Sequence, residues 1–307
     1  MRLSVMVFGF VCVCALVIGT AAPIVQDDED VRGAFLTSRP KEKTATSGAS
    51  AAAKPSRRRP KSSGGSNNPN KPTDKTPVKP ENSGNKPGQP SDPVTPVNAR
   101  RIGVGVTLFM RDSNGLAVRV DPDHVFRKGD RVRILLETNS DGYLYIFNTT
   151  DDGPATLIYP DASLDEGGNY LQAHVPFEIP STLSTEERLR WFAFDDVAGT
   201  EHLFFVFTRE PLGGVPIDDE LIAYCGEAKE RCPIKPNSEV WAGVQKQMQE
   251  PLKTDKSKQY GRAQTSGEQE ATARGFGLAK DDPQPSLVMM ASSTRSTLVA
   301  TLDLIHK

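Results

Sequence analysis

Residue 100 divides the chain into two parts of opposite composition. From Arg39 to Ala99 there is no Phe, Tyr or Trp, and proline occurs eleven times. Such a segment cannot bury enough apolar surface to offset the conformational entropy lost on folding. We therefore expect a disordered linker rich in Pro, Lys and Ser over residues 23–99, and a folded domain over residues 100–307. Deleting residues 39–95 should then leave the unfolding midpoint almost unchanged.

Short apolar runs separated by turn residues begin directly after the linker. In residues 131–138, alternate positions are apolar, which indicates a strand with one buried face. Residues 142–148 and 202–208 are apolar on both sides, so we expect them at the centre of a sheet. Together these runs predict a mainly β domain, an antiparallel immunoglobulin-like β-sandwich. The predicted core comprises Leu108, Val132, Ile134, Leu136, Leu144, Ile146, Phe204 and Val206.

The sandwich is expected to use residues 101–210 and a pair of C-terminal strands within residues 286–307. The two C-terminal runs could pair as a hairpin through Ser292–Ser296. Residues 211–285 have a mixed pattern and predict an irregular insertion that is flexible from residue 250 onward. It contains two short helical segments, Asp218–Tyr224 and Ser238–Gln249, the second with Ser238 as a plausible N-cap.

The N-terminus has the pattern of an export signal. Arg2 is followed by an apolar run from Leu3 to Ile18 and then by small residues up to Ala22. This order predicts a secretory signal peptide over residues 1–22. The alternative is an uncleaved anchor, because about 20 apolar residues can span a bilayer. We expect an exported protein in the periplasm, at the cell surface or secreted, with no transmembrane span after cleavage.

Charge is distributed unevenly along the chain. Residues 39–100 carry 13 basic and 4 acidic groups, a net +9, whereas residues 101–307 carry 22 basic and 31 acidic groups, a net −9. An acidic folded part argues against nucleic-acid binding. A contact with an anionic polymer is possible through the basic run, and a solvated charge run is the simpler alternative. The basic run contains Arg57, Arg58, Arg59 and Lys61.

Residues 101–210 resemble a bacterial family, the domain of unknown function DUF4384. The resemblance rests on residues 105–109, 126–133, 139–148, 158–160, 199–204 and 209–211, and on the ending 302–307. Relatives in this family are exported proteins or extracytoplasmic modules attached to kinases and caspase-like peptidases. The resemblance implies a β-sandwich accessory module without a known activity. It supplies no catalytic residues.

Two cysteines remain after the predicted signal peptide, Cys225 and Cys232, with six residues between them. Export would place them in an oxidising compartment, where such a pair tends to form a disulfide. The spacing is long enough for the chain to turn and bring the two Cα atoms within bonding range. Two reduced thiols in a surface helix are the alternative.

The chemistry expected of this chain is limited. The four histidines are isolated in sequence, and we expect no catalytic residue, metal site or cofactor. Tyr143, Tyr145 and Trp191 are candidates for an exposed aromatic surface that binds an envelope protein or glycan. These features favour a non-enzymatic interaction module of the bacterial cell envelope. The alternative is an envelope glycan-active hydrolase with paired carboxylates such as Asp195 and Glu201.

Overall fold

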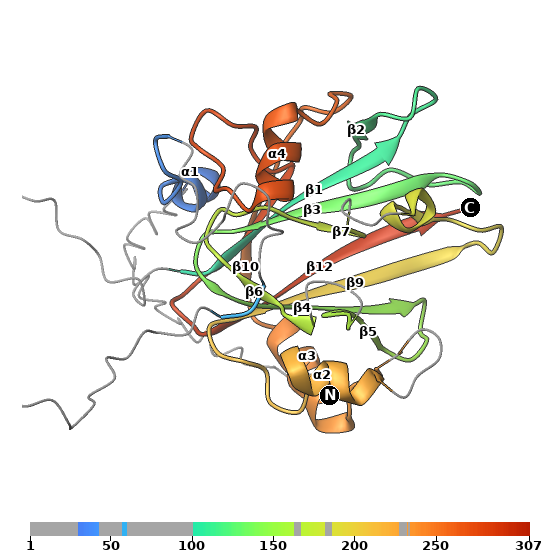
Figure 1. Ribbon diagram of the computed structural model, residues 1–307, viewed down its shortest axis with the longest axis vertical. Helices are drawn as coiled ribbons and strands as arrows, with labels where there is room; N and C mark the ends of the chain where they lie inside the picture. Colours follow the sequence, from blue (N-terminus) through green and yellow to red (C-terminus); the bar gives the residue numbers. More distant parts are fainter. Residues whose placement is uncertain are drawn as a thin grey trace, which may run out of the picture. The chain divides into compact units, whose positions relative to one another are not determined.

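The computed structural model describes residues 30–42, 57–59, 101–162, 167–181, 186–226, 232 and 234–307. Residues 31–307 form one compact unit. Within its described residues, two antiparallel sheets pack face to face, and helices cover the outer face of each sheet (Figure 1). The predicted mainly β sandwich is therefore confirmed. No helix in the described ranges is long and apolar enough to cross a membrane.

The first sheet has the strand order β10-β11-β1-β3-β7, with β2 beside β1 and β8 beside β3. Its register places Leu108 opposite Ile134, so alternate side chains of neighbouring strands enter the same side. The strands are β1 (Gly103–Arg111), β2 (Ala117–Arg119), β3 (Arg131–Thr138), β7 (Phe177–Ile179), β8 (Phe192–Ala193), β10 (Leu252–Lys256) and β11 (Leu287–Ala291).

The second sheet has the order β12-β9-β4-β5, with β6 beside β4. Val206 in β9 lies opposite Tyr145 on one side and Val299 on the other, so β9 is central as its sequence predicts. The strands are β4 (Gly142–Thr150), β5 (Thr156–Tyr159), β6 (Tyr170–Leu171), β9 (Gly199–Thr208) and β12 (Thr297–His306).

The main core lies between the two sheets. Six of the eight predicted core residues belong to it and are fully buried, namely Leu108, Val132, Ile134, Leu136, Leu144 and Ile146. The assignment of Phe204 and Val206 to this core is wrong, because they lie on the opposite face of β9 and Leu203, Phe205 and Phe207 enter the core instead. A strand that is apolar on both faces does not reveal by its own pattern which face meets the other sheet.

Helices cover the two outer faces. In Figure 1, α2 (Asp218–Cys225) and α3 (Ser238–Met248) lie on the side of the second sheet, and α1 (Val31–Leu36) and α4 (Ser266–Arg274) lie on the side of the first. A short 3-10 helix spans Glu187–Arg190. The helices α2 and α3 confirm the two predicted helical segments. The N-cap of α3 is Asn237 and not Ser238, because Asn237 Oδ1 accepts a hydrogen bond from the backbone N–H of Val240 at 2.8 Å.

The expectation that residues 250–285 form a flexible insertion is wrong. Residues 252–256 form β10 at the edge of the first sheet, and α4 lies on its outer face. The expected C-terminal hairpin does not form, since β11 pairs with β1 and β10 while β12 pairs with β9. β11 and β12 therefore belong to different sheets, and each contributes buried apolar side chains to the core between the sheets.

The predicted disordered linker does not hold for residues 30–42 and 57–59. We call residues 31–42 the N-terminal strap: α1 inserts Phe35 (0% exposed) against Val288 and Met290 of β11. The side chain has room because Gly103 and Gly105 lie beneath it, and a Cβ on Gly103 would lie 3.0 Å from the Phe35 ring. Residues 43–56 and 60–100, and the predicted signal peptide over residues 1–22, lie outside the described residues.

Candidate functional site

The aromatic residues proposed as a binding surface are buried. Tyr143, Tyr145 and Trp191 are 4%, 0% and 9% exposed. The hydroxyl of Tyr145 accepts a hydrogen bond from the Leu212 backbone N–H at 2.8 Å, and the Arg133 guanidinium lies 4.3 Å from the centroid of the Trp191 ring. The exposed aromatic surface is therefore a wrong expectation. Tyr143 and Tyr145 belong to the cluster of β4 with α2 and α3, and Trp191 packs with Phe109 and Leu135.

A cavity of about 440 Å³ lies between α3 and the second sheet. We call it the α3 cavity. Its buried lining is aliphatic and comes from β9, β12 and α3, while its exposed lining is polar. The aliphatic residues of α3 lie one helical turn apart and face the sheet together. The aliphatic set is Val206, Leu212, Val240, Val244 and Val299, and the polar set is Asn237, Glu239, Lys246, Gln247 and Thr297.

Three glycines form part of the lining of the α3 cavity. Gly213, Gly214 and Gly243 belong to its lining, and a Cβ added at Gly213 or Gly243 would meet no atom within 4 Å. Gly214 has φ +79°, a conformation that L side chains rarely adopt. In the sequence, the apolar stripe of α3 indicated only packing. The adjacent Gly213-Gly214 pair was the remaining signal that the helix does not close fully on the sheet.

A second cluster of chemically active groups lies under the N-terminal strap. Ser38 Oγ and His174 Nε2 are 2.7 Å apart, and His174 Nδ1 is 2.6 Å from Glu137 Oε1. This order of hydroxyl, imidazole and carboxylate matches the geometry of a nucleophile with its base and orienting group. His174 also has φ +60°, and such strained positions are frequent at active sites. The same geometry fits either a catalytic triad or a structural hydrogen-bond network.

The surroundings of this cluster favour a structural role. Arg39 clamps Glu137, and its five N–H donors match five hydrogen bonds, two to Glu137 and three to the backbone carbonyls of Ala279, Asp282 and Pro283. Ser38 Oγ also lies 3.3 Å from the Asn139 carbonyl oxygen. No member of the cluster lines the α3 cavity or the cavity lined by Arg111, Gly129 and Arg131.

The electrostatics of Glu137 fit this interpretation. Burial would raise the pKa of Glu137, but the hydrogen bonds and charges of Arg39 and His174 outweigh it and hold that pKa below its usual value. Arg39, Glu137 and His174 are 2%, 2% and 1% exposed. The cluster holds the strap on the first sheet through a charge pair that stays ionised. Sequence reasoning missed it because its members lie far apart along the chain.

Arg57 of the basic run is not available to an external polymer. Its side chain is 4% exposed, and Nη2 donates a hydrogen bond to the Pro176 carbonyl at 3.0 Å. Its guanidinium also lies 5.3 Å from the centroid of the Phe177 ring. The expectation that Arg57 contacts an anionic polymer is therefore corrected: burial of the guanidinium removes it from the surface.

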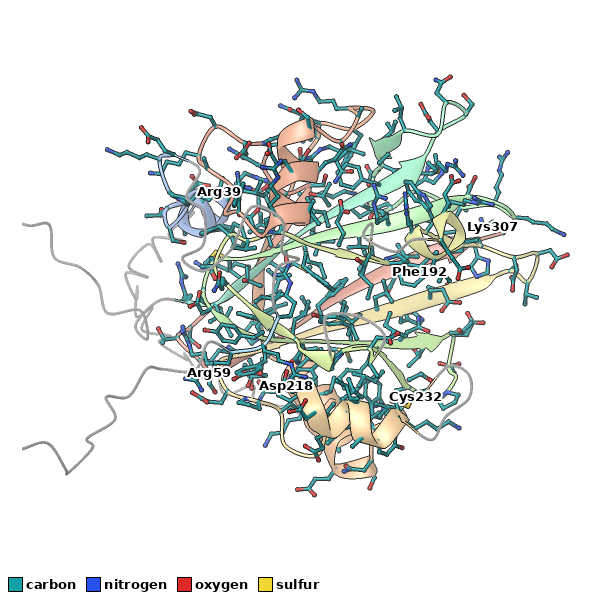
Figure 2. The ribbon with its side chains drawn as sticks, viewed as in Figure 1. Arg39, Arg59, Phe192, Asp218, Cys232 and Lys307 are labelled. Atoms are coloured by element: carbon teal, nitrogen blue, oxygen red, sulfur yellow. A yellow bond between two sulfur atoms is a disulfide. The ribbon has the colours of Figure 1, made fainter. Side chains whose placement is uncertain are left out.

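The next two arginines pair with acidic groups of the domain. Arg58 Nη2 lies 2.8 Å from Asp219 Oδ1, and Arg59 Nη1 lies 3.7 Å from Glu210 Oε2. Figure 2 shows Arg59 and the start of α2 at the same end of the domain, well away from Arg39. Lys61, the fourth residue of the expected contact, lies outside the described residues. Arg58 and Arg59 thus each have an acidic partner in the domain.

Asp195 and Glu201, the example of paired carboxylates, have separate local roles. Asp195 Oδ1 accepts a hydrogen bond from the Val197 backbone N–H at 2.9 Å. Glu201 accepts hydrogen bonds from the Asn148 amide at 2.8 Å and from the Thr150 hydroxyl at 3.0 Å. Neither carboxylate lines the α3 cavity. The structure thus gives this pair no shared site.

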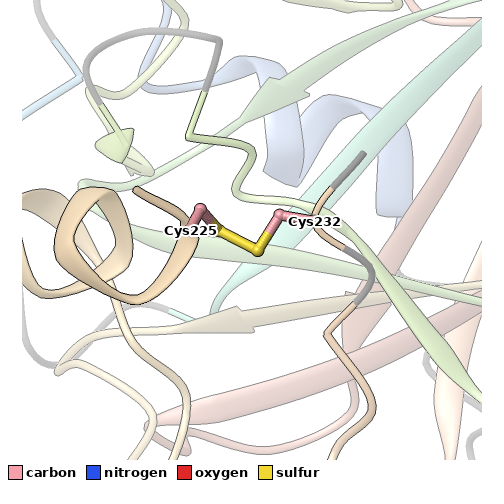
Figure 3. The surroundings of a disulfide bond; sticks show 2 residues. All are labelled: Cys225 and Cys232. Atoms are coloured by element: carbon pink, nitrogen blue, oxygen red, sulfur yellow. A yellow bond between two sulfur atoms is a disulfide. The ribbon is translucent and has the colours of Figure 1, made fainter. Parts of the chain in front are cut away.

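Cys225 and Cys232 are joined by a disulfide with a Cα–Cα distance of 5.5 Å (Figure 3). Cys225 is the last residue of α2, and it packs with Leu221 and Ile234 against the outer face of the second sheet. The predicted disulfide is present. It fixes the end of α2 near the segment that leads into α3.

Comparison with known proteins identifies one domain. Residues 125–211 match the model of a family described as a domain of unknown function (DUF4384). This range includes β3 to β9, whereas β1, β11 and β12 come from outside it and complete both sheets. No curated protein and no solved structure matches the chain.

Proposed function

We propose that this chain, which carries a DUF4384 domain at residues 125–211, is a non-enzymatic interaction module of the bacterial cell envelope. It binds its partner through the α3 cavity. The observation that supports this proposal is the cavity itself, about 440 Å³ with aliphatic buried walls and polar exposed walls. Sites for small molecules and single side chains have this size and this division of polarity. The occupant of this site is a short aliphatic or amphipathic group.

The chemistry of the lining supports binding over catalysis. Among its described residues there is one carboxylate, Glu239, and one amine, Lys246, and there is no His, Cys, Ser or Asp. Glu239 and Lys246 lie at opposite ends of α3, two turns apart on an exposed edge. General acid–base or nucleophilic catalysis needs such groups within hydrogen-bond reach of one another. The two charges are better suited to orient a ligand that carries polar groups at its ends.

The test uses one position inside the α3 cavity and one outside it. Gly243→Phe places a ring where a Cβ meets no atom within 4 Å, and Ala242→Phe places the same ring on the exposed face of the same helix. We expect the fluorescent probe 8-anilinonaphthalene-1-sulfonate to bind the wild type and Ala242→Phe alike, and Gly243→Phe at least tenfold more weakly. Equal binding to all three proteins would contradict the proposal.

The envelope assignment needs its own measurement. N-terminal sequencing of the protein from an envelope fraction should begin after Ala21 or Ala22, as expected for a cleaved signal peptide. Recovery of Met1 would favour an uncleaved anchor, and recovery of the protein only from the cytoplasm would overturn the envelope assignment.

One observation favours an enzyme as the second candidate, namely the aligned Ser38, His174 and Glu137. A hydrolase of this kind would use a serine nucleophile in place of paired carboxylates. Reaction of the chain with a fluorophosphonate probe decides between them. If the chain is an interaction module, we expect no labelling of Ser38, because Arg39 pairs with Glu137 and because no member of the cluster lines the α3 cavity.

A further inference from the structure

Residues 57–59 lie on the domain in the manner of a bound peptide. The backbone N–H of Tyr170 in β6 donates a hydrogen bond to the Arg57 carbonyl at 2.7 Å. This one backbone hydrogen bond places Arg57 beside β6 at the edge of the second sheet. Gly168 makes this approach possible, because a Cβ at that position would lie 2.7 Å from the Arg57 carbonyl carbon and oxygen. Main-chain pairing at a sheet edge is one of the general modes of peptide recognition.

The first side chain of this segment fits a site that discriminates in favour of arginine. Arg57 is almost fully buried, with its guanidinium over Phe177 and one N–H bonded to the Pro176 carbonyl. A planar guanidinium can stack on a ring and donate along its edge at the same time. A lysine ammonium at the same position would keep the charge but lose the planar contact. The contacts of Arg57 therefore depend on the planar shape of its guanidinium, while its buried Nε has no hydrogen-bond partner among the described residues.

The second and third side chains meet acidic groups. Arg58 lies between Asp219 at 2.8 Å and Asp218 at 3.9 Å, and Arg59 pairs with Glu210. The pKa of Asp218 is raised, because partial burial and the neighbouring Asp219 together outweigh the lowering effect of Arg58. Asp218 Oδ1 is buried and has no hydrogen-bond donor among the described residues. The cation paired with this oxygen is Arg58, whose Nε lies 3.9 Å away.

We infer that this edge is a recognition site for an extended, arginine-rich peptide segment of a partner protein, and that residues 57–59 occupy it as an internal ligand. We call it the β6 edge site, defined by Gly168, Tyr170, Pro176, Phe177, Glu210, Asp218 and Asp219. The charge of the partner is thus positive, opposite to that of the anionic polymer expected from the basic run alone. The site is separate from the α3 cavity, so each can fail without the other.

The experiment empties the site in the full chain and refills it with a peptide. Arg57→Ser, Arg58→Ser and Arg59→Ser are introduced together, and a fluorescein-labelled peptide with the sequence of residues 54–62, KPSRRRPKS, is added. We expect saturable binding by anisotropy at low salt. A peptide of equal charge, KPSKKKPKS, should bind at least tenfold more weakly, because it cannot stack on Phe177.

Matched acidic variants locate the binding. In the emptied chain, Asp219→Asn should weaken the arginine peptide about two- to fivefold at low salt, the effect of one exposed ion pair. Asp152→Asn removes an equally exposed charge elsewhere and should leave the affinity unchanged. If the triple variant does not fold, Arg58→Ser with Arg59→Ser keeps the buried Arg57 and still exposes the acidic half of the site.

Three results would overturn the inference. The arginine peptide could show no binding up to about 1 mM, where the free energy of association is only about −4 kcal/mol. The lysine peptide could bind equally well, which would reduce the contact to general charge attraction. Asp219→Asn and Asp152→Asn could have the same effect, which would place the peptide elsewhere on the acidic surface.

Discussion

Arg39 and Glu137 are 98 residues apart in the sequence and form a bidentate ion pair, with N···O distances of 2.7 and 2.6 Å. Both residues are almost fully buried, with 2% of the surface of each exposed. The pair connects the N-terminal strap to β3 of the first sheet. A segment that composition assigns to a linker is in this way part of the folded domain.

Replacement of Arg39 by alanine should destabilise the domain strongly. The substitution leaves the Glu137 carboxylate buried without its counter-charge, and breaking a buried pair in this way costs about 3–5 kcal/mol. Urea unfolding monitored by circular dichroism measures the loss. Lys41→Ala is the matched control, because Lys41 is exposed in the same strap and should change the free energy of unfolding by less than about 0.5 kcal/mol. Equal effects of the two variants would show that the strap is not part of the cooperative unit.

Acid should weaken the attachment of the strap. The folded-state pKa of Glu137 lies below its usual value, so its contribution is fully present above the unfolded pKa of about 4.3. That contribution is lost as the pH falls through the lower, folded-state pKa. The free energy of unfolding of the wild type should therefore decrease as the pH falls below the unfolded-state pKa of about 4.3. Denaturant titrations across this range provide the measurement.

The control for the acid effect removes the titrating carboxyl while it keeps the shape of the pair. Arg39→Met combined with Glu137→Gln is expected to have a shallower dependence of stability on pH over the same range, since replacing a whole buried pair is tolerated better than breaking it. If the double variant and the wild type had the same slope, Glu137 would not be the group responsible.

The disulfide should stabilise the α2 side of the domain moderately. Cys225→Ser with Cys232→Ser opens a loop with a sequence separation of 7, for which chain entropy predicts a loss of about 2–3 kcal/mol. Differential scanning calorimetry of the wild type and the double variant tests this value. A mass-spectrometric count of alkyl groups added without reductant is the direct check: zero is expected after removal of residues 1–22, and two would show that the thiols are free.

Ser38 should not react as an activated nucleophile. Glu137 is held by two hydrogen bonds from Arg39, Ser38 Oγ lies 3.3 Å from the Asn139 carbonyl oxygen, and Ser38 does not line the α3 cavity. Incubation with a fluorophosphonate probe, followed by peptide mapping, is expected to find no adduct at Ser38. An adduct that disappears in both Ser38→Ala and His174→Ala would replace the interaction module by a hydrolase.

The local pattern of the sequence was sufficient for most strands and two helices. Alternation at Val132, Ile134 and Leu136 identified β3, and the apolar stripe of Val240 and Val244 identified α3. These elements have one apolar face that the period of the sequence displays directly. The fold class follows from such elements and could be predicted without the structure.

Two of the elements that the sequence did not reveal, α4 and the N-terminal strap, are held by buried charge. In α4 the buried face carries Glu268, paired with Arg119 at 2.5 Å, where an amphipathic helix would carry an apolar residue. The capping box of Thr265 and Glu268 was the available signal for this helix. The strap was missed for the same reason, because a single Phe35 and a single Arg39 have no period to detect.

The candidate binding site was the least predictable part. The exposed aromatic residues expected from composition are packed inside, and the α3 cavity depends on how far a helix stands from a sheet. The cavity is lined by Gly213, Gly214 and Gly243 together with valines from three elements. A cavity between elements is a property of their packing, which no single segment encodes.

Hydrogen–deuterium exchange measures directly whether a ligand binds in the α3 cavity. The full chain is compared with and without a solubilised envelope extract, and the Gly243→Phe variant serves as the blocked control. If the α3 cavity is the binding site, the extract should protect residues 238–248 and 297–299 from exchange in the wild type but not in Gly243→Phe. Protection that leaves these residues unchanged, or that persists in the blocked variant, would contradict it.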